Sequence, residues 1–326
     1  MFKKIIPTSL LIIFCLSINF LSGHSELFRC YHYPIEYRVD FDSLLSEGHE
    51  IDLKASEFAQ NKLHGWYYDH EIHAVVPNDI NQTDEEWKKT KDKIARVIGP
   101  LPSYINQDYR SWKNSAKTVD ELIQDASIMA PSFIKDFEHL ASLTGTKANF
   151  GPNNQYAMKS RASLINKVKR DSNEFKISDE EAVTLIGDAL RGTLILNDLS
   201  QIPTVVAEII NYAKDHDARV TFKNLWAEDR ESGYVGIHAK LLLPLHNSEK
   251  GKAQRYILAE MQIHLYSIFD GTSESVKERG HLIYEHVRDL EDFDHLKHSA
   301  ASRLLFLTAM QEVLKALDKK QSDKQL

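Results

Sequence analysis

Cysteine is scarce in this sequence, with only Cys15 and Cys30 in 326 residues. Cys15 lies within an apolar N-terminal run, so cleavage after that run leaves one cysteine, and no disulfide framework can form within a single mature chain. An excess of basic residues is also absent, because 40 Lys and Arg face 47 Asp and Glu. General basicity therefore does not hold this protein to nucleic acid, and any anionic ligand requires a local basic site.

Several enzyme motifs are missing as well. The sequence has no Gly-rich phosphate loop ending in Lys-Ser or Lys-Thr, no nucleophile elbow and no His-Glu-x-x-His helix. His70 and His73 place two imidazoles three residues apart, but no third ligand is spaced with them, so we assign no metal site there. With 42% hydrophobic and 27% charged residues, the chain has the composition of a globular protein with a sizeable core.

The N-terminus has the features of an export signal. Met-Phe-Lys-Lys is followed by an apolar run over 5–21 and by small residues at Gly23 and Ser25. We therefore predict a signal peptide over 1–25 and a secreted or periplasmic protein. No stable membrane association is expected after cleavage, since no later charge-free stretch approaches about 20 residues. The alternative is an uncleaved membrane anchor, which the shortness of the run and Pro7 disfavour.

Hydrophobic periodicity predicts helices first, then a sheet, then helices again. Apolar residues spaced by threes and fours indicate a helix over 118–143, which Pro131 is expected to kink or split. Capped helices are expected to begin near Thr83 and Ser178, and a basic helix is expected over 158–170, after a loop over 144–155. Strand-like runs cover 192–196, 219–225, 234–243 and 255–265, and further helices are predicted over 200–214, 273–289 and 299–317.

This order of elements predicts an α+β fold. We divide the chain into a signal peptide (1–25), an N-terminal accessory region (26–115), a main domain (116–318) and a polar tail (319–326).

Polar residues occupy alternate positions of two predicted strands. Residues two apart in a strand share a face, so Glu260, Gln262 and His264 should point together, while Met261 and Ile263 face the other side. The same spacing aligns four residues of the preceding strand: Tyr234, Gly236, His238 and Lys240. The pattern predicts a sheet with one apolar face and one polar, functional face.

Two carboxylates and a set of basic residues indicate phosphate chemistry at that face. We expect Asp188, at the start of one strand, and Glu260 to share a Mg²⁺ ion, which prefers oxygen ligands and needs only one or two carboxylates when phosphates complete its shell. The basic residues nearest to them are Lys159, Arg161, Lys167, Lys169, Arg170, Arg191, Lys223 and Arg230. They are suited to neutralising a triphosphate. Alternatively, the helix bases form an ordinary solvated face and Glu260 is an ordinary strand residue.

In order along the chain, these segments resemble the synthetase domain of the RelA/SpoT family, which makes hyperphosphorylated guanosine alarmones, over about 149–288. The family's donor-binding helix corresponds to Lys159, Ser163 and Lys167, and its strand-starting Asp to Asp188. Its Lys-x-Asn-Gly-Tyr-x-Ser-x-His element corresponds to 230–238, its Glu-x-Gln-Ile-Arg-Thr strand to 260–265, and its later His and Tyr to His281 and Tyr284. The sequence departs from the family at Ala157 and His264, where Arg is common, and in placing Arg191 three residues after Asp188 rather than five.

The resemblance implies a nucleotidyltransferase-like synthetase fold: a mixed sheet of about five strands flanked by helices, with a helical N-terminal extension. It also implies transfer of the β,γ-pyrophosphate of ATP to the 3'-hydroxyl of a purine nucleotide. Asp188 and Glu260 would hold Mg²⁺ and carry the catalysis, and Tyr234 would stack on the acceptor base. The residues expected to bind substrates are Lys159, Ser163, Lys167, Arg191, Lys223, Arg230, Tyr234, His238, Gln262, His264 and His281.

The acceptor and the setting stay open at this point. ATP is scarce outside the cytoplasm, so an exported enzyme of this type is expected to act as a toxin or effector delivered into another cell. The 3' end of a transfer RNA is a second acceptor class, which the net acidity disfavours. Two further alternatives are a nucleotide-binding or interaction module without turnover, favoured by Ala157 and His264, and a structural periplasmic protein whose motifs are coincidental.

Overall fold

A computed structural model describes residues 50–63, 65–69, 72, 74–101, 111–228, 230, 232–245, 253–272, 275–287 and 293–323. The predicted signal peptide, the first part of the accessory region, and His70 and His73 lie outside the described residues. None of the helices in the described ranges combines the length and apolar character that crossing a membrane requires.

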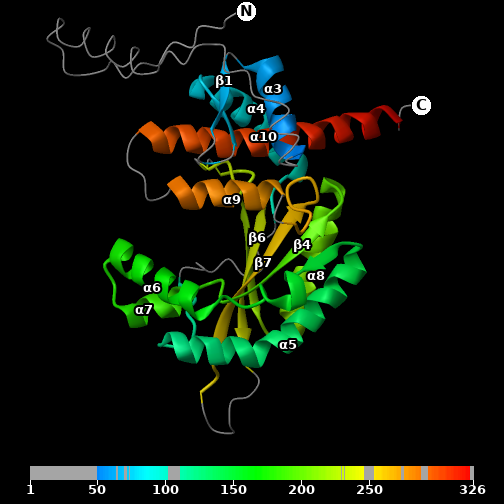
Figure 1. The fold of residues 1–326 in the computed structure, drawn as a ribbon. Helices are drawn as coiled ribbons and strands as arrows, with labels where there is room; N and C mark the ends of the chain where they lie inside the picture. The colour runs from blue at the N-terminus through cyan, green and yellow to red at the C-terminus, as the bar shows by residue number, and fades with distance from the viewer. Residues whose placement is uncertain are drawn as a thin grey trace, which may run out of the picture. The chain divides into compact units, whose positions relative to one another are not determined.

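The fold is built on a five-stranded mixed sheet, shown in Figure 1. In spatial order its strands are β3 (Lys147–Asn149), β4 (Leu190–Leu196), β7 (Tyr256–Leu265), β6 (Ile237–Pro244) and β5 (Arg219–Asn224). β4 and β7 are parallel and every other neighbouring pair is antiparallel. The α+β class and the sheet of about five strands are therefore confirmed. β3 was not predicted, because three residues are too few to show a strand period.

Helices α5 (Val119–Thr144) and α8 (Ile202–Asp215) pack on the sheet and on each other. The ring of Phe137 in α5 packs edge-on against Phe150, with the centroids 5.0 Å apart. Gly192 of β4 leaves room for both rings, since a Cβ there would lie 2.5 Å from Phe150 and 3.1 Å from Phe137. α5 continues through Pro131 as one helix, so the predicted split is wrong. Buried residues on both sides of the proline hold the helix against the sheet despite the lost hydrogen bond.

Helix α6 (Arg161–Phe175) begins later than the sequence predicted. Its cap is Ser160, whose hydroxyl accepts a hydrogen bond from the Ser163 amide, and α7 (Asp179–Leu185) is capped in the same way by Ser178, as expected. Lys159 therefore precedes the helix. Its backbone N–H donates to the Ala189 carbonyl at 2.9 Å, which fixes this lysine beside the start of β4.

The described part of the N-terminal region consists of α3 (Glu50–Lys62), the antiparallel strands β1 (Trp66–Asp69) and β2 (Ala74–Pro77), and α4 (Ile80–Ile98). These elements pack on α10 (Phe293–Asp323), which also packs on α9 (Val276–Val287) (Figure 1). α4 begins three residues before the predicted Thr83, because the Asp79 carboxylate caps it. α10 continues to Asp323, beyond the predicted helix end at 317.

Candidate active site

Two rows of polar residues cross the sheet, each with one residue from β4, β7 and β6. The rows are Arg191, Glu260 and Lys240, and Thr193, Gln262 and His238. Met261 and Ile263, which alternate with these positions on β7, are buried in the core. The predicted division of the sheet into a polar and an apolar face is therefore confirmed at β7.

Glu260 is nearly buried and interacts with three neighbours. Its Oε1 accepts a hydrogen bond from Nε2 of Gln262 at 2.8 Å, and its Oε2 lies 3.3 Å from Nδ1 of His238 and 3.6 Å from Nζ of Lys240. Burial raises the pKa of this carboxyl, but His238, Lys240 and Gln262 together outweigh burial and hold the pKa well below its usual range. Glu260 is therefore an anion at neutral pH.

Asp188 lies two residues before β4 and is held by two lysines. Its carboxylate accepts hydrogen bonds from Nζ of Lys159 at 2.6 Å and from Nζ of Lys167 at 2.9 Å. Burial raises the pKa of Asp188, but the ammonium groups of Lys167 and Lys159 outweigh burial and lower this pKa to about 2. Burial also lowers the pKa of Lys159, although Asp188 partly offsets this. The two predicted donor-binding lysines thus converge on a predicted metal-binding carboxylate.

Asp188 and Glu260 lie close enough for the charge of Glu260 to raise the pKa of Asp188. Lys240 stands beside both segments. Its ammonium contacts Glu260, and a Cβ added at Gly187 would lie only 2.5 Å from it. Alternation along the strand predicted that Lys240 lies on this face but indicated no role for it. Its position opposite Glu260 across two antiparallel strands follows only from the register.

Tyr234 is fixed by its hydroxyl between two imidazoles. The oxygen lies 3.1 Å from Nε2 of His238 and 3.0 Å from Nε2 of His264, and the ring packs edge-on against Phe306 with the centroids 6.0 Å apart. Burial raises the pKa of the phenol, so it stays protonated. Gly236 leaves room for this arrangement, because a Cβ there would lie 2.6 Å from the His264 ring.

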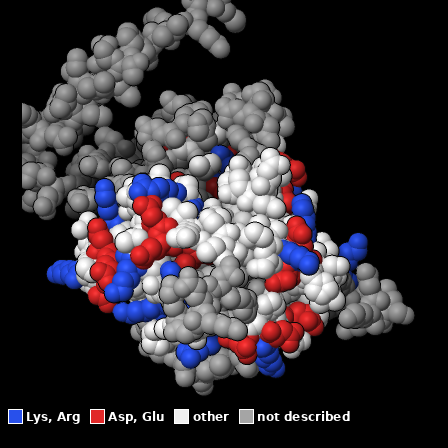
Figure 2. Space-filling view, turned by 90° about the horizontal axis from the view of Figure 1, so that it is seen from below, with Lys and Arg blue, Asp and Glu red and all other residues white. Residues whose placement is uncertain are grey.

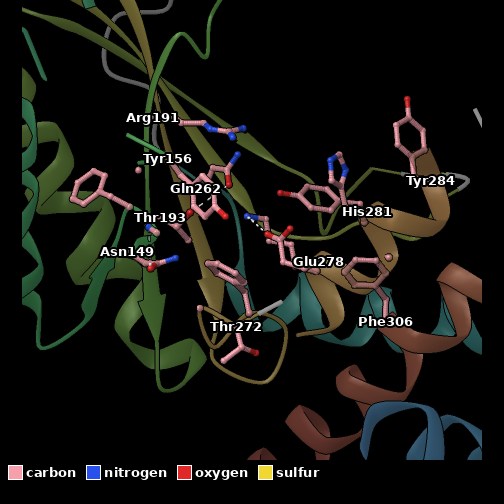
Figure 3. A pocket seen from close by; sticks show the side chains of 18 of the residues that line it. Asn149, Tyr156, Arg191, Thr193, Gln262, Thr272, Glu278, His281, Tyr284 and Phe306 are labelled. Carbon is pink, nitrogen blue, oxygen red and sulfur yellow. Dashed lines mark hydrogen bonds and ion pairs between the residues drawn. The ribbon is translucent and has the colours of Figure 1, made fainter. Parts of the chain in front are cut away.

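A pocket of about 860 Å³ lies between the polar face of the sheet and helices α9 and α10. Figure 3 shows Arg191, Thr193 and Gln262 on the sheet side and His281 and Phe306 on the helix side. Its lining also includes Tyr156, Arg230, Ser232, Tyr234, Phe269, Lys277, Glu278, Gly280, Tyr284 and Ser302. Asp188 and Glu260 are not part of the lining, but Arg191 and Gln262 are, and both are neighbours of Glu260.

The remaining predicted binding residues fall into two groups. Arg230 and His281 line the pocket. The His281 ring stacks on Tyr284 with the centroids 6.4 Å apart, and Arg230 pairs with Glu228 at 3.2 Å. The others lie outside the lining: Ser163 contacts the cap of α6, Lys223 pairs with Glu228, and His264 is buried behind Tyr234.

Sequence reasoning missed two lining residues that stand out in the structure. Tyr156 is 54% exposed, and its ring packs on the backbone of Gly151, where a Cβ would lie 1.9 Å from it. An exposed aromatic residue in a loop rich in Gly, Asn and Pro was the available signal. Lys277 lies over the Phe269 ring, 4.2 Å from its centroid, and nothing in the local sequence distinguished it from an ordinary helix-start lysine.

The donor set fits a magnesium ion better than a transition metal. Within the described ranges, no cluster of three or more His, Cys, Asp and Glu side chains is arranged to hold a metal. Mg²⁺ needs only one or two carboxylates when phosphate oxygens supply the remaining ligands, and Asp188 and Glu260 are two neighbouring anionic carboxylates. Lys159 and Lys167 already pair with the Asp188 carboxylate. Asp188 can therefore bind Mg²⁺ only if the phosphates of the donor draw both lysines away from it.

No protein-family model and no curated protein matches this sequence. Among solved structures, small alarmone synthetase 1 from Bacillus subtilis bound to its product pppGpp is similar at 15% identity and a TM-score of 0.43, covering 63% of this chain and 95% of that one. Small alarmone synthetase 2 from Bacillus subtilis is similar at 19% identity and a TM-score of 0.41, covering 63% and 98%. A GTP pyrophosphokinase family protein from Streptococcus pneumoniae is similar at 12% identity and a TM-score of 0.44, covering 63% of this chain and 94% of that one. Likeness at these values does not transfer an activity to this chain.

Proposed function

We propose that this protein is an ATP-dependent nucleotide pyrophosphokinase, which transfers the β,γ-pyrophosphate of ATP to the 3'-hydroxyl of a purine nucleotide. The observation that carries the proposal is a pair of anionic carboxylates held by lysines, Asp188 by Lys159 and Lys167 and Glu260 by Lys240. Glu260 also neighbours Arg191 and Gln262, which line a nucleotide-sized pocket together with Tyr234. The motif resemblance to RelA/SpoT synthetases over 149–288 supports the same reaction.

The donor would bind on the side of Asp188. Lys159 and Lys167 bring two ammonium groups to one carboxylate, and donor phosphates would replace that carboxylate as their partner. Asp188 and Glu260 would then hold Mg²⁺, which supplies neutralisation of the phosphate charge. Arg191 pairs with Glu260 across the two strands and lines the pocket, so it would lie between the two substrates.

The acceptor would bind in the pocket, with its base against the aromatic residues and its ribose toward Gln262 and Arg191. In the reaction, the 3'-oxygen forms a bond to the β-phosphorus while the bond from that phosphorus to the α-phosphate oxygen breaks, which releases AMP. The hydroxyl proton passes to Glu260. No covalent enzyme intermediate is needed, so positioning and charge neutralisation provide the catalysis.

A mononucleotide acceptor is favoured over a transfer RNA. On the face of the protein shown in Figure 2, basic and acidic side chains are interspersed over the described residues, whereas RNA affinity depends largely on neutralising many phosphates. If the predicted signal peptide exports the chain, the enzyme would meet ATP inside a recipient cell, which is the setting of a toxin or effector.

The test is incubation of the full chain with labelled ATP, Mg²⁺ and GTP, GDP, ATP, AMP or transfer RNA, followed by separation of the products. Glu260→Gln should abolish pyrophosphate transfer and leave the circular dichroism spectrum unchanged, whereas Glu174→Gln, an exposed carboxylate of α6, should change neither. Full turnover by Glu260→Gln would contradict the proposal. Nucleotide binding without transfer by the wild-type protein would favour the second candidate, a binding module. The pairing of Asp188 with lysines and the burial of His264 are the observations in its favour.

A further inference from the structure

The described N-terminal region, residues 50–101, contributes no residue to the lining of the pocket. It nevertheless contacts each of the three elements that form the pocket wall opposite the sheet: α9, α10 and the described residues of the loop over 225–236, which are 225–228, 230 and 232–236. We propose that the N-terminal region is a positioning element of the acceptor pocket, so that its packing and acceptor binding are energetically coupled. This inference rests on the proposed function for the identity of the ligand.

The contact with α9 is a buried ion pair. Nη2 of Arg279 lies 2.7 Å from Oδ2 of Asp52 in α3, and the two side chains are only 9% and 0% exposed. Arg279 stands between the pocket residues Glu278 and Gly280. A change at Asp52 would take this carboxylate away from a buried guanidinium, so it should displace this turn of α9.

The contact with α10 is a second ion pair, between Nη2 of Arg303 and Oδ1 of Asp84 in α4 at 2.8 Å. The loop lies directly against this arginine, because a Cβ at Gly233 would be 2.8 Å from the Arg303 Cα, and the φ of Gly233 is +73°. The neighbouring Ser302 hydroxyl donates to the Ser232 carbonyl at 2.6 Å. Ser302 and Ser232 both line the pocket.

The contact with the loop comes from Lys91 of α4. Its Nζ donates to the backbone carbonyl of Glu228 at 2.9 Å, and the lysine is only 5% exposed. The Glu228 carboxylate in turn pairs with Arg230, which lines the pocket two residues before Ser232. The hydrogen bond from this buried ammonium to the loop carbonyl is of the strong, charge-assisted kind, and it fixes the loop at Glu228.

The donor residues depend on other elements. Lys159 is fixed by the backbone of Ala189, Lys167 belongs to α6, and Asp188 precedes β4. Loosening the N-terminal region should therefore weaken acceptor binding and leave donor binding largely intact. A general loss of stability would weaken the binding of both nucleotides. Comparing acceptor binding with donor binding therefore distinguishes a positioning role from a general loss of stability.

The experiment uses the full chain with Asp52→Asn and Lys91→Met, and with Lys93→Met as the matched control. Lys93 also joins α4 to α10, through Asp318 at 3.3 Å, but that pair is exposed. Binding of GDP, as the acceptor probe, and of ATP would be measured by titration calorimetry, and hydrogen exchange would be followed in α9 and the 225–236 loop.

We expect Asp52→Asn and Lys91→Met each to weaken GDP binding by about tenfold, to leave ATP binding within about twofold, and to increase exchange in α9 or the loop respectively. Lys93→Met should match the wild type. The positioning role would be overturned if both variants had the GDP affinity and the hydrogen exchange of the wild type. It would also be overturned if GDP and ATP lost affinity equally. If Asp52→Asn does not fold, the result for Lys91→Met decides. If the wild type binds neither nucleotide, the proposed function fails instead, and the exchange data alone decide whether this region orders the wall.

Discussion

Nδ1 of His238 lies 3.3 Å from Oε2 of Glu260, while Nε2 of the same ring lies 3.1 Å from the hydroxyl of Tyr234. One imidazole thus connects the proposed catalytic carboxylate with the ring proposed to contact the acceptor. His264 binds the other side of the same hydroxyl at 3.0 Å, so the phenol is fixed from two directions. The Tyr234 hydroxyl and the Tyr234 ring therefore have separable roles.

Tyr234→Phe removes the hydroxyl and keeps the ring. Without its hydroxyl, the ring loses the contacts with His238 and His264 that fix its position. We expect the KM for the acceptor to rise severalfold, because one net hydrogen bond contributes about 1 kcal/mol. Tyr234→Ala also removes the stacking surface and should raise that KM by a further factor of about ten. Steady-state kinetics at saturating ATP would measure both. Equal effects of the two substitutions would show that the ring does not contact the acceptor.

Lys167→Met tests the donor side. The methionine side chain keeps much of the length of lysine but loses the ammonium that contacts Asp188 at 2.9 Å. We expect the KM for ATP to rise on the order of ten- to a hundredfold, because hydrogen bonds to charged groups contribute about 1.5–3 kcal/mol. Lys169→Met, at an exposed position two residues along α6, is the control and should leave the KM unchanged. Similar values for the two variants would remove Lys167 from the donor site.

The sequence predicted the main part of the fold because its periods are long and strong. The helix over 118–143 and the strand over 255–265 appear within one or two residues of their predicted bounds, as Val119–Thr144 and Tyr256–Leu265. Short or tertiary features were not predictable. β3 has three residues, and the start of α4 was misplaced because Thr83 resembles a cap, although Asp79 forms it and Thr83 is buried.

For the site, alternation along β7 was enough to place Glu260 and Gln262 on one face. Strand register decides which residues lie opposite Glu260 and Gln262, and register depends on pairing between positions far apart in the sequence. The contact of Lys240 with Glu260 at 3.6 Å was therefore not predicted. The burial of individual polar side chains could not be predicted from the sequence either. His264 was expected to bind substrate, yet it is 1% exposed and interacts with Tyr234.

Gly187→Ala tests the position of Lys240. The new methyl group would lie 2.5 Å from Nζ of Lys240, and because that atom ends a flexible side chain, the fold should survive while the ammonium moves away from Glu260. We expect kcat to fall by about tenfold, because Lys240 would no longer hold the Glu260 carboxylate in position, with little change in Tm. A large loss of Tm, or unchanged kcat with an unchanged Tm, would contradict this role of Gly187.

His264 should make the stability of the protein depend on pH. Burial lowers the pKa of His264 well below its ordinary value of 6.5, and the neighbouring Lys277 and His238 act in the same direction, although Glu260 partly opposes this. The unfolded chain takes up a proton as the pH falls below 6.5, whereas the folded chain does not. The unfolding free energy should therefore decrease between pH 7 and pH 5 by up to about 1.4 kcal/mol per pH unit through this residue alone.

His264→Gln should remove that part of the pH dependence. At pH 7.5 the variant should be less stable than the wild type, because the hydrogen bond to the Tyr234 hydroxyl is weakened, and the difference should shrink as the pH falls. Urea unfolding at several pH values would measure the slopes. His139→Gln, at an exposed position of α5, removes no buried histidine and should keep the wild-type slope. If His264→Gln keeps that slope as well, His264 is not held neutral in the folded protein.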